Sequence, residues 1–141
     1  MTLTTQSMTR EQRKSIAVEY FKRLDDGGDV VGLFAETADV HFPKWGIARG
    51  KAQIEVMFGE VGRLLSSIRH HYEDFNVVID EDVVVVEGTS HGVAADGTEW
   101  GTGAEPGRWC DVFEIRDFTI HRCFIYLDPD YTGADSDRYP W

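Results

Sequence analysis

The feature that most constrains the fold of this chain is a change in the spacing of its apolar residues. In segments before residue 67, apolar side chains recur three or four positions apart, as in Tyr20, Phe21 and Leu24, and this spacing places them on one face of a helix. From Arg69 onward the period is two, which is typical of strands. Helices followed by long, closely connected strands predict the α+β class, with a curved, mainly antiparallel sheet wrapped around N-terminal helices and enclosing a pocket.

The first helix is predicted from Thr9 to Asp26. Thr9 and Gln12 form a capping-box pattern at its start. Gly27-Gly28 ends it, because glycine readily adopts the left-handed conformation found at helix ends.

The other elements follow from the same two periods. Asp29 is expected to cap a short second helix that includes Phe34, and a third helix is predicted from Lys51 to Ser66. A Gly-rich loop is predicted over 95–107. The predicted strands are Ala38–Phe42, Trp45–Arg49, Arg69–Asp80, Val83–Ala94, Arg108–Arg116 and Thr119–Leu127.

Length and charge narrow the classes of function. The 141 residues show no shift in composition, which predicts one domain over 1–141, with a flexible N-terminal segment (1–8) and a C-terminal tail (128–141). The net charge of −11 argues against nucleic acid as a partner. There is no apolar run of about 20 residues, no signal-like N-terminus and no metal-type cysteine spacing. We therefore expect a cytoplasmic protein with no membrane span, no metal and no cofactor.

Three stretches carry a resemblance to a known family: DDGGDVVGLFAETADVHF (25–42), GKAQIEVMF (50–58) and WCDVFEIRDFTIHRCFIYLDPDY (109–131). The chain resembles the nuclear transport factor 2-like superfamily, and within it the SnoaL-like group, which includes polyketide cyclases and scytalone dehydratase. The resemblance covers residues 9–141 and implies a cone-shaped domain with a pocket between sheet and helices. It also implies a homodimer formed through the outer face of the sheet. The fold hosts several chemistries as well as non-catalytic binders, so it does not set the reaction.

The last predicted strand independently favours that homodimer. Its two faces are both largely apolar, and a large apolar patch is unusual on the surface of a monomer. One face can cover the core, and the other needs a partner. The residues of the two faces are Cys123, Ile125 and Leu127, alternating with Phe124, Tyr126 and Asp128.

Asp111 is the first candidate for chemistry. It shares one face of its predicted strand with Trp109, Phe113 and Ile115, so that face is expected to point inward. Burial raises the pKa of a carboxyl group and suits it to proton transfer near neutral pH. The competing interpretation is a core aspartate paired to an arginine or a backbone amide. In the SnoaL-like cyclases that this chain resembles, the aspartate of a similar Asp-x-Phe motif is the acid/base, and Asp111 matches it.

Three histidines are the next candidates. A turn centred on Glu81 would place His71 opposite His91, with His70 one step away, and histidine is well suited to proton transfer. If side chains alternate without a break along this strand, His71 shares the inward face with Phe75. The likeness to scytalone dehydratase instead favours His70 and His91 as the histidines that face the pocket. A bulge would reconcile the two. A surface histidine pair explains the pattern equally well.

The remaining candidates are one acidic residue, one tyrosine and a set of residues expected to line the pocket. Asp26 matches the acidic residue that orients a catalytic histidine in the dehydratase-like enzymes, although acids are frequent in ordinary helix ends. Tyr20, on the apolar stripe, could donate to a developing oxyanion or simply fill the core. Substrate-binding walls that suit a hydrophobic or aromatic ligand are expected from Phe42, Phe58, Trp109, Phe113 and Tyr126.

One departure from the family removes a known reaction. Steroid isomerases of the superfamily carry an aspartate directly before the proline that ends the first strand, and this chain has Phe42 before Pro43. The leading hypothesis is a cofactor-independent lyase, cyclase or isomerase that acts on a hydrophobic or aromatic small molecule. Asp111 would be the acid/base, His91 with His70 or His71 would move a second proton, and Tyr20 would orient the substrate. The alternatives are a non-catalytic binding module for a hydrophobic ligand and a structural dimer module with a collapsed pocket.

Overall fold

The computed structural model describes residues 7–43, 45–102 and 107–129. The first helix, α1 (Arg10–Asp26), begins as expected: Thr9 accepts a hydrogen bond from the Gln12 amide, and the Gln12 side chain accepts one from the Thr9 amide. Gly27 ends the helix with a φ of 69°, a left-handed conformation that side chains with a Cβ rarely adopt. Both predicted ends of this helix are confirmed.

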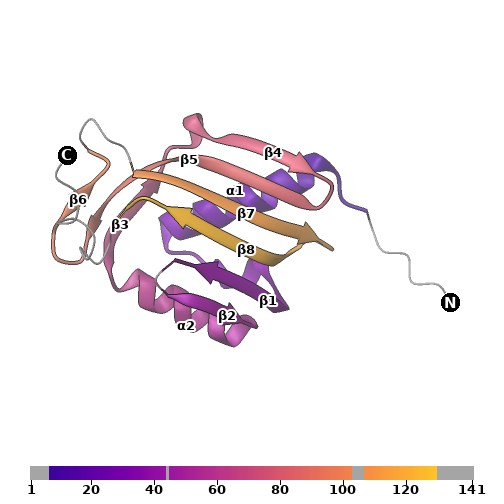
Figure 1. Cartoon of the computed structure of the whole chain (residues 1–141), viewed down its shortest axis with the longest axis horizontal. Coiled ribbons are helices and arrows are strands. Elements are labelled where there is room, and N and C mark those ends of the chain that lie inside the picture. Colours follow the sequence, from indigo (N-terminus) through magenta and orange to yellow (C-terminus); the bar gives the residue numbers. More distant parts are fainter. Residues whose placement is uncertain (1–6, 44, 103–106, 130–141) are drawn as a thin grey trace.

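A second helix, two short turns and a set of strands follow α1 in the described chain (Figure 1). Two one-turn 3-10 helices cover Val31–Leu33 and Tyr72–Asp74. The second α-helix is α2 (Lys51–Gly62), and the strands are β1 (Phe34–Phe42), β2 (Gly46–Arg49), β3 (Leu65–His70), β4 (Asn76–Asp80), β5 (Val83–Ala94), β6 (Glu99–Trp100), β7 (Gly107–Arg116) and β8 (Thr119–Leu127).

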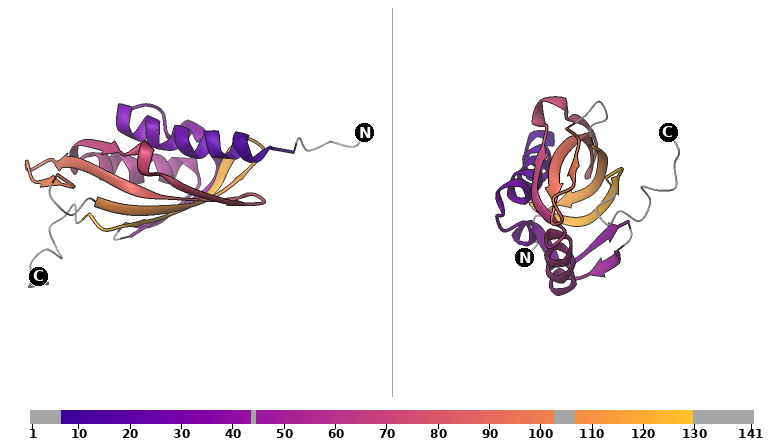
Figure 2. Two further views of the ribbon diagram at one scale, coloured as in Figure 1. Left: turned by 90° about the horizontal axis from the view of Figure 1, so that it is seen from above. Right: turned by 90° about the vertical axis from the view of Figure 1, so that its left-hand side faces the viewer.

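The strands form one curved, mixed sheet in the order β2-β1-β8-β7-β5-β3, with β4 and β6 pairing with β5 outside this path. All pairings are antiparallel except β1 with β8, which is parallel. Both helices lie on the same side of the sheet, which curls around them (Figure 2). The expected fold class, a cone-shaped α+β domain with a curved, mainly antiparallel sheet, is confirmed.

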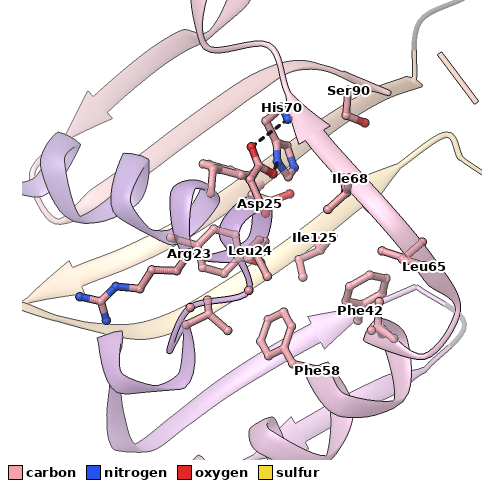
Figure 3. Close-up of a pocket in the computed structure, with 18 of the residues that line it drawn as sticks. Arg23, Leu24, Asp25, Phe42, Phe58, Leu65, Ile68, His70, Ser90 and Ile125 are labelled. Carbon is pink, nitrogen blue, oxygen red and sulfur yellow. Dashed lines mark hydrogen bonds and ion pairs between the residues drawn. The ribbon is translucent and has the colours of Figure 1, made fainter. Parts of the chain in front are cut away.

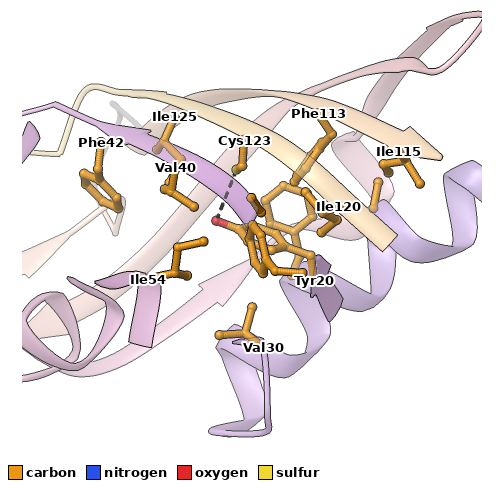
Figure 4. Close-up of a cluster of buried hydrophobic side chains, with 14 of the residues drawn as sticks. Tyr20, Val30, Val40, Phe42, Ile54, Phe113, Ile115, Ile120, Cys123 and Ile125 are labelled. Carbon is orange, nitrogen blue, oxygen red and sulfur yellow. Dashed lines mark hydrogen bonds between the residues drawn. The ribbon is translucent and has the colours of Figure 1, made fainter. Parts of the chain in front are cut away.

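The core lies between α1 and the concave face of the sheet (Figure 4). Tyr20 and Phe21 are each 1% exposed, and the ring of Tyr20 lies 5.1 Å from that of Phe113 in an edge-to-face arrangement. Burying a large apolar side chain contributes about 1.5–3 kcal/mol. The alternation predicted for β7 is confirmed, since Trp109, Asp111, Phe113 and Ile115 are all buried.

Four boundaries differ from the predictions. The third predicted helix ends at Gly62 instead of Ser66, because the chain enters β3 at Leu65. The strand predicted over Arg69–Asp80 is two strands separated by the turn Tyr72–Asp74. Phe34 begins β1 instead of ending a helix, although Asp29 does accept a hydrogen bond from the Gly32 amide. The Gly-rich loop contains the short strand β6.

The ends of the described chain bear on two further expectations. Met8, expected in a flexible segment, is 8% exposed, and its sulfur accepts a hydrogen bond from the Phe118 amide. Residues 1–6 and most of the expected tail, 130–141, lie outside the described residues. Within the described parts of the chain, no helix is long and apolar enough to cross a membrane.

Candidate functional site

A cavity of about 510 Å³ lies between the two helices and the concave face of the sheet (Figure 3). Ligand pockets in proteins measure roughly 300–1,000 Å³, so the interpretation of a structural module with a collapsed pocket is wrong. Apolar side chains from several elements make up much of its wall, including Leu24, Phe42, Phe58, Leu65 and Ile125. Polar residues from several elements also line it, and His70 and Asp111 are the buried titratable groups that the sheet contributes.

The first polar group is a hydrogen-bonded pair, Asp25 and His70. Asp25 Oδ1 lies 2.5 Å from His70 Nδ1, and Asp25 Oδ2 accepts a second hydrogen bond, of 3.0 Å, from the His70 backbone amide. The Asp25 and His70 side chains are 1% and 6% exposed, respectively. Tyr72 donates a third hydrogen bond to Asp25 Oδ2 at 2.7 Å. The carboxylate therefore holds both the ring and the backbone of His70.

These three donors decide the charge of Asp25. Burial raises its pKa, but the hydrogen bonds from the His70 side chain and backbone and from Tyr72 outweigh burial and hold the pKa below its ordinary value. An ionised carboxylate only accepts hydrogen bonds, so the adjacent Nδ1 of His70 carries a proton. In neutral His70 the basic lone pair is then on Nε2, the arrangement of a general base oriented by an acid.

Asp25 was not among the residues predicted from the sequence, although the helical pattern contains a signal for it. Ala17, Tyr20, Phe21 and Leu24 form the buried stripe of α1, and Asp25 stands four residues after Phe21, where the stripe continues. The assignment of this role to Asp26 is wrong. Asp26 lies off the stripe and forms an exposed ion pair with Arg69.

The structure also decides which histidine faces the cavity. His70 alternates with Ile68 on β3, and both line the cavity. The prediction that His71 turns inward is wrong, because it assumed unbroken alternation back from Phe75, which precedes β4. The 3-10 turn Tyr72–Asp74 interrupts that alternation. The expected register is wrong by two residues, since Arg69 is opposite His91 and His70 is opposite Ser90.

His91 therefore lies on the convex face of the sheet, because Ser90 occupies the inward position beside it. The expected meeting of two imidazoles does occur, but outside the cavity: His71 Nε2 lies 2.7 Å from His91 Nδ1. The structure does not bring His91 or His71 to the cavity with Asp111.

The second polar group is built around Asp111 on β7. Asp111 is 3% exposed, and burial raises its pKa well above the ordinary value, although a hydrogen bond with Tyr20 opposes this. The Tyr20 hydroxyl also lies 3.9 Å from the thiol of Cys123 (Figure 4). Burial likewise raises the pKa values of Tyr20 and Cys123. A raised pKa keeps Asp111 protonated further toward neutral pH than an ordinary aspartate, which makes it a proton donor.

Trp109 connects the two polar groups. It stands two residues before Asp111 on the same face of β7, and its ring lies 5.2 Å from that of His70. Its indole N–H is buried, with no hydrogen-bond partner among the described residues. Ser90, which the sequence patterns did not single out, lines the cavity opposite His70 and is 1% exposed.

The five predicted walls divide into two groups. Trp109, Phe42 and Phe58 line the cavity as expected. Phe113 lies instead in the core against Tyr20. Tyr126 is 57% exposed and points to the convex face, because its neighbour Ile125 takes the inward position. The wall prediction is wrong for these last two residues.

The family follows from a match to the SnoaL-like domain model over residues 17–122. The matched range includes the second half of α1, the sheet as far as the start of β8, and the polar cavity residues Asp25, His70 and Asp111. The chain belongs to the SnoaL-like family. Among proteins of curated function, none matches the sequence.

Solved structures agree with this assignment. The SnoaL-like chain is similar to TerC co-crystallised with polyporic acid (TM-score 0.69, 17% identity, 83% of this chain and 92% of that one). It is also similar to an NTF2-like protein from Anabaena variabilis ATCC 29413 (TM-score 0.71, 18% identity, 90% of this chain and 97% of that one). A third similar structure is a candidate polyketide cyclase from Xanthomonas campestris pv. campestris (TM-score 0.66, 17% identity, 84% of this chain and 92% of that one). At these identities the likeness establishes the NTF2-like fold alone.

Proposed function

We propose that this SnoaL-like protein is a cofactor-independent lyase, cyclase or isomerase that moves protons on a hydrophobic or aromatic small molecule in its cavity. The observation that carries the proposal is the placement of two complementary groups on the wall of one cavity. His70 is oriented as a base by an ionised Asp25, whereas Asp111 is buried and favours its protonated form. Pairs of titratable groups whose surroundings separate their pKa values are typical of acid–base sites.

The two groups would have distinct tasks. Nε2 of His70 would remove a proton from a carbon adjacent to a substrate carbonyl, and Asp25 would stabilise the resulting imidazolium. Asp111, whose buried carboxyl has a raised pKa, would donate a proton to the developing or departing oxygen and recover it from His70 or solvent at the end of the cycle. In this scheme every proton removed is returned, so no oxidant and no cofactor is required.

The substrate class is proposed from the walls. Phe42, Phe58 and Trp109 offer flat apolar surfaces, and the cavity volume of about 510 Å³ is suited to a compound of a few fused or linked rings. The co-crystallisation of TerC with polyporic acid and the candidate polyketide cyclase among similar structures favour an aromatic, oxygen-rich compound. We therefore propose polyketide-like carbonyl compounds as the first to test.

A second candidate function is a non-catalytic binding module for a hydrophobic molecule. It is favoured by one observation: the Asp111 carboxyl is only 3% exposed, as a purely structural group would be. In this case the polar groups would only orient the ligand.

One experiment separates the two candidates. A panel of aromatic carbonyl compounds, including polyporic acid, is incubated with the wild type, His70→Gln, Asp111→Asn and the control His121→Gln, whose histidine lies on β8 beside Thr119. Binding is measured by calorimetry and conversion by mass spectrometry. The enzyme proposal predicts conversion that falls about 100- to 10,000-fold in the two cavity variants and is unchanged in the control. Binding without conversion of any compound would favour the binding module.

We also propose that the protein is a cytoplasmic homodimer joined through the convex face of the sheet. This proposal is supported by exposed apolar side chains on that face: Tyr126 is 57% exposed and Ile47 is 46% exposed. Together with Phe124 and His41 they border a shallow hollow on β1, β2 and β8, and a second copy would cover it.

A further inference from the structure

Trp109 has a hydrogen-bond donor that nothing in the described chain satisfies. Among the described residues, its Nε1 is the only buried side-chain nitrogen or oxygen without a partner. The whole residue is 7% exposed. Buried polar groups are nearly always paired, and leaving one unpaired costs stability. The folded protein therefore carries a donor whose hydrogen bond is still to be made.

The surroundings of the indole explain why its donor is unpaired. Phe21 lies 4.5 Å from the indole with the planes 35° apart, and the rings of Phe75 and His70 lie 5.0 and 5.2 Å away, each at 82°. On β5, Trp109 is paired with Gly88, where a Cβ atom would come within 2.8 Å of the indole Cζ2. Glycine thus leaves the space that the indole occupies. The ring is held by its shape, and none of these neighbours accepts its proton.

The position of Trp109 points to a role in ligand binding. It precedes Asp111 by two residues on the inward face of β7, and its ring contacts that of His70 on β3. All three residues line the cavity. A ligand oxygen bound to the indole nitrogen would bring the atoms beside that oxygen close to both titratable groups.

We propose that the Trp109 N–H binds a carbonyl oxygen of the ligand and selects ketone- or quinone-type compounds over hydrocarbons of the same shape. The indole nitrogen donates and cannot accept, so the ligand atom that pairs with it is an acceptor. Trp109 would then determine both which ligand enters and how its carbonyl group is oriented. This inference rests on the proposed use of the cavity for a carbonyl compound, but not on the reaction proposed there.

Binding requires a small rearrangement of the wall. In the free protein the indole nitrogen is covered, so the ligand has to part the rings around it. An edge-to-face contact between two rings stabilises less than a buried donor loses when it is left unpaired. Exchanging one such contact for an N–H···O=C hydrogen bond is therefore favourable. A hydrocarbon ligand gains nothing from the exchange, since the donor remains unpaired.

The test compares two ligands that differ in one oxygen, benzophenone and diphenylmethane. Benzophenone has no hydrogen on the carbons beside its carbonyl group, so it cannot undergo the proposed proton removal and reports binding alone. Affinities for both ligands are measured by NMR titration of the wild type, Trp109→Phe and the control Trp45→Phe, whose tryptophan packs against Phe42 behind the wall.

The ratio of the two affinities isolates the N–H group. We expect the preference for benzophenone over diphenylmethane to fall about 5- to 150-fold in Trp109→Phe and to be unchanged in Trp45→Phe. A smaller ring at position 109 alters the packing against both ligands alike, so a purely structural role would leave the ratio unchanged.

A second readout does not require any variant to fold. In the wild type, benzophenone should move the proton signal of the Trp109 indole N–H downfield, and diphenylmethane should not. The proposal is overturned if the ratio is unchanged in Trp109→Phe, if both ligands move the Trp109 signal alike, or if benzophenone does not bind in the cavity. A protein that shows both effects but converts none of the aromatic carbonyl compounds would support the proposal and refute the reaction alone.

Discussion

Replacing Asp25 with asparagine should invert the hydrogen bonding of His70 while conserving the shape of the site. In the wild type the carboxylate accepts from His70 Nδ1, from the His70 amide and from Tyr72. The asparagine oxygen can still accept at the Oδ2 position from the amide and from Tyr72. The amide nitrogen would then face Nδ1 and could only donate to it. Nδ1 would lose its proton, and the neutral ring would change from the Nδ1–H to the Nε2–H form.

The cost to stability follows from the change in bond type. Hydrogen bonds to charged groups contribute about 1.5–3 kcal/mol, against about 0.5–1.5 kcal/mol for neutral ones. Three bonds lose their charge assistance, and the Asp25 side chain is 1% exposed, so solvent screening does not reduce the effect. Each bond therefore loses about 1–1.5 kcal/mol, and we expect the free energy of unfolding at pH 7 to fall by about 3–4 kcal/mol in Asp25→Asn, as measured by urea denaturation.

The pH dependence of this difference has a definite sign. The folded pKa of Asp25 is held below its ordinary value, so the stabilisation is present above the unfolded pKa, near 3.9, and is lost as the pH falls through the folded pKa. The gap between wild type and Asp25→Asn should therefore narrow below about pH 4.

The decisive assay is a ¹⁵N spectrum of the histidine rings, which requires no substrate. We expect a protonated Nδ1 on His70 in the wild type and a protonated Nε2 in Asp25→Asn, with His121 unchanged. If His70 of the wild type already carries its proton on Nε2, or if the substitution leaves the ring unchanged, Asp25 does not orient His70 as a base.

Four other predictions follow from particular residues. Tyr72→Phe removes one donor to Asp25, so denaturation should show a loss of about 1 kcal/mol, and a titration should show a higher Asp25 pKa; an unchanged pKa would count against the role of Tyr72. Asp111→Asn should flatten the dependence of the unfolding free energy on pH above about pH 4. The pKa of Asp111 is raised in the folded state, so its protonated form adds stability below the unfolded-state pKa, and this stability is lost as the pH rises through the folded-state pKa. An unaltered slope would show that Asp111 ionises normally. Gly27→Ala should cost about 1 kcal/mol in urea denaturation, because the φ of 69° is unfavourable for alanine although its methyl group meets no neighbour; no loss would show that this backbone conformation is not required. Tyr126→Glu should convert the proposed dimer to a monomer in light scattering, whereas Glu73→Gln on an exposed turn should not; a monomeric wild type would refute the dimer.

The fold was accessible from the sequence because its signals are local. The capping box at Thr9, the glycine at position 27 and the length of β5 are set by residues close together in the chain, and the change of period separates helices from strands. The inward position of Asp111 followed from alternation alone, since β7 is continuous around it.

The histidine side of the site was less accessible because it depends on a break in a strand. Alternation carries information only along an uninterrupted strand, and the 3-10 turn at Tyr72–Asp74 reverses the faces predicted for His70 and His71. The pairing of Asp25 with His70 joins residues 45 positions apart, and no local pattern reveals such a contact. The helical stripe that ends at Asp25 was the available signal.

Proton transfer through His70 is the activity proposed for the cavity. Hydrogen–deuterium exchange into a bound 1,3-dicarbonyl aromatic compound in D₂O tests it most directly, because exchange reports removal of a proton whether or not a later step follows. We predict exchange by the wild type at a rate about 100- to 10,000-fold above that of His70→Gln, with the His121→Gln control equal to the wild type. A compound shown by NMR to occupy the cavity that exchanges no faster with wild-type protein than with His70→Gln would contradict proton removal by His70.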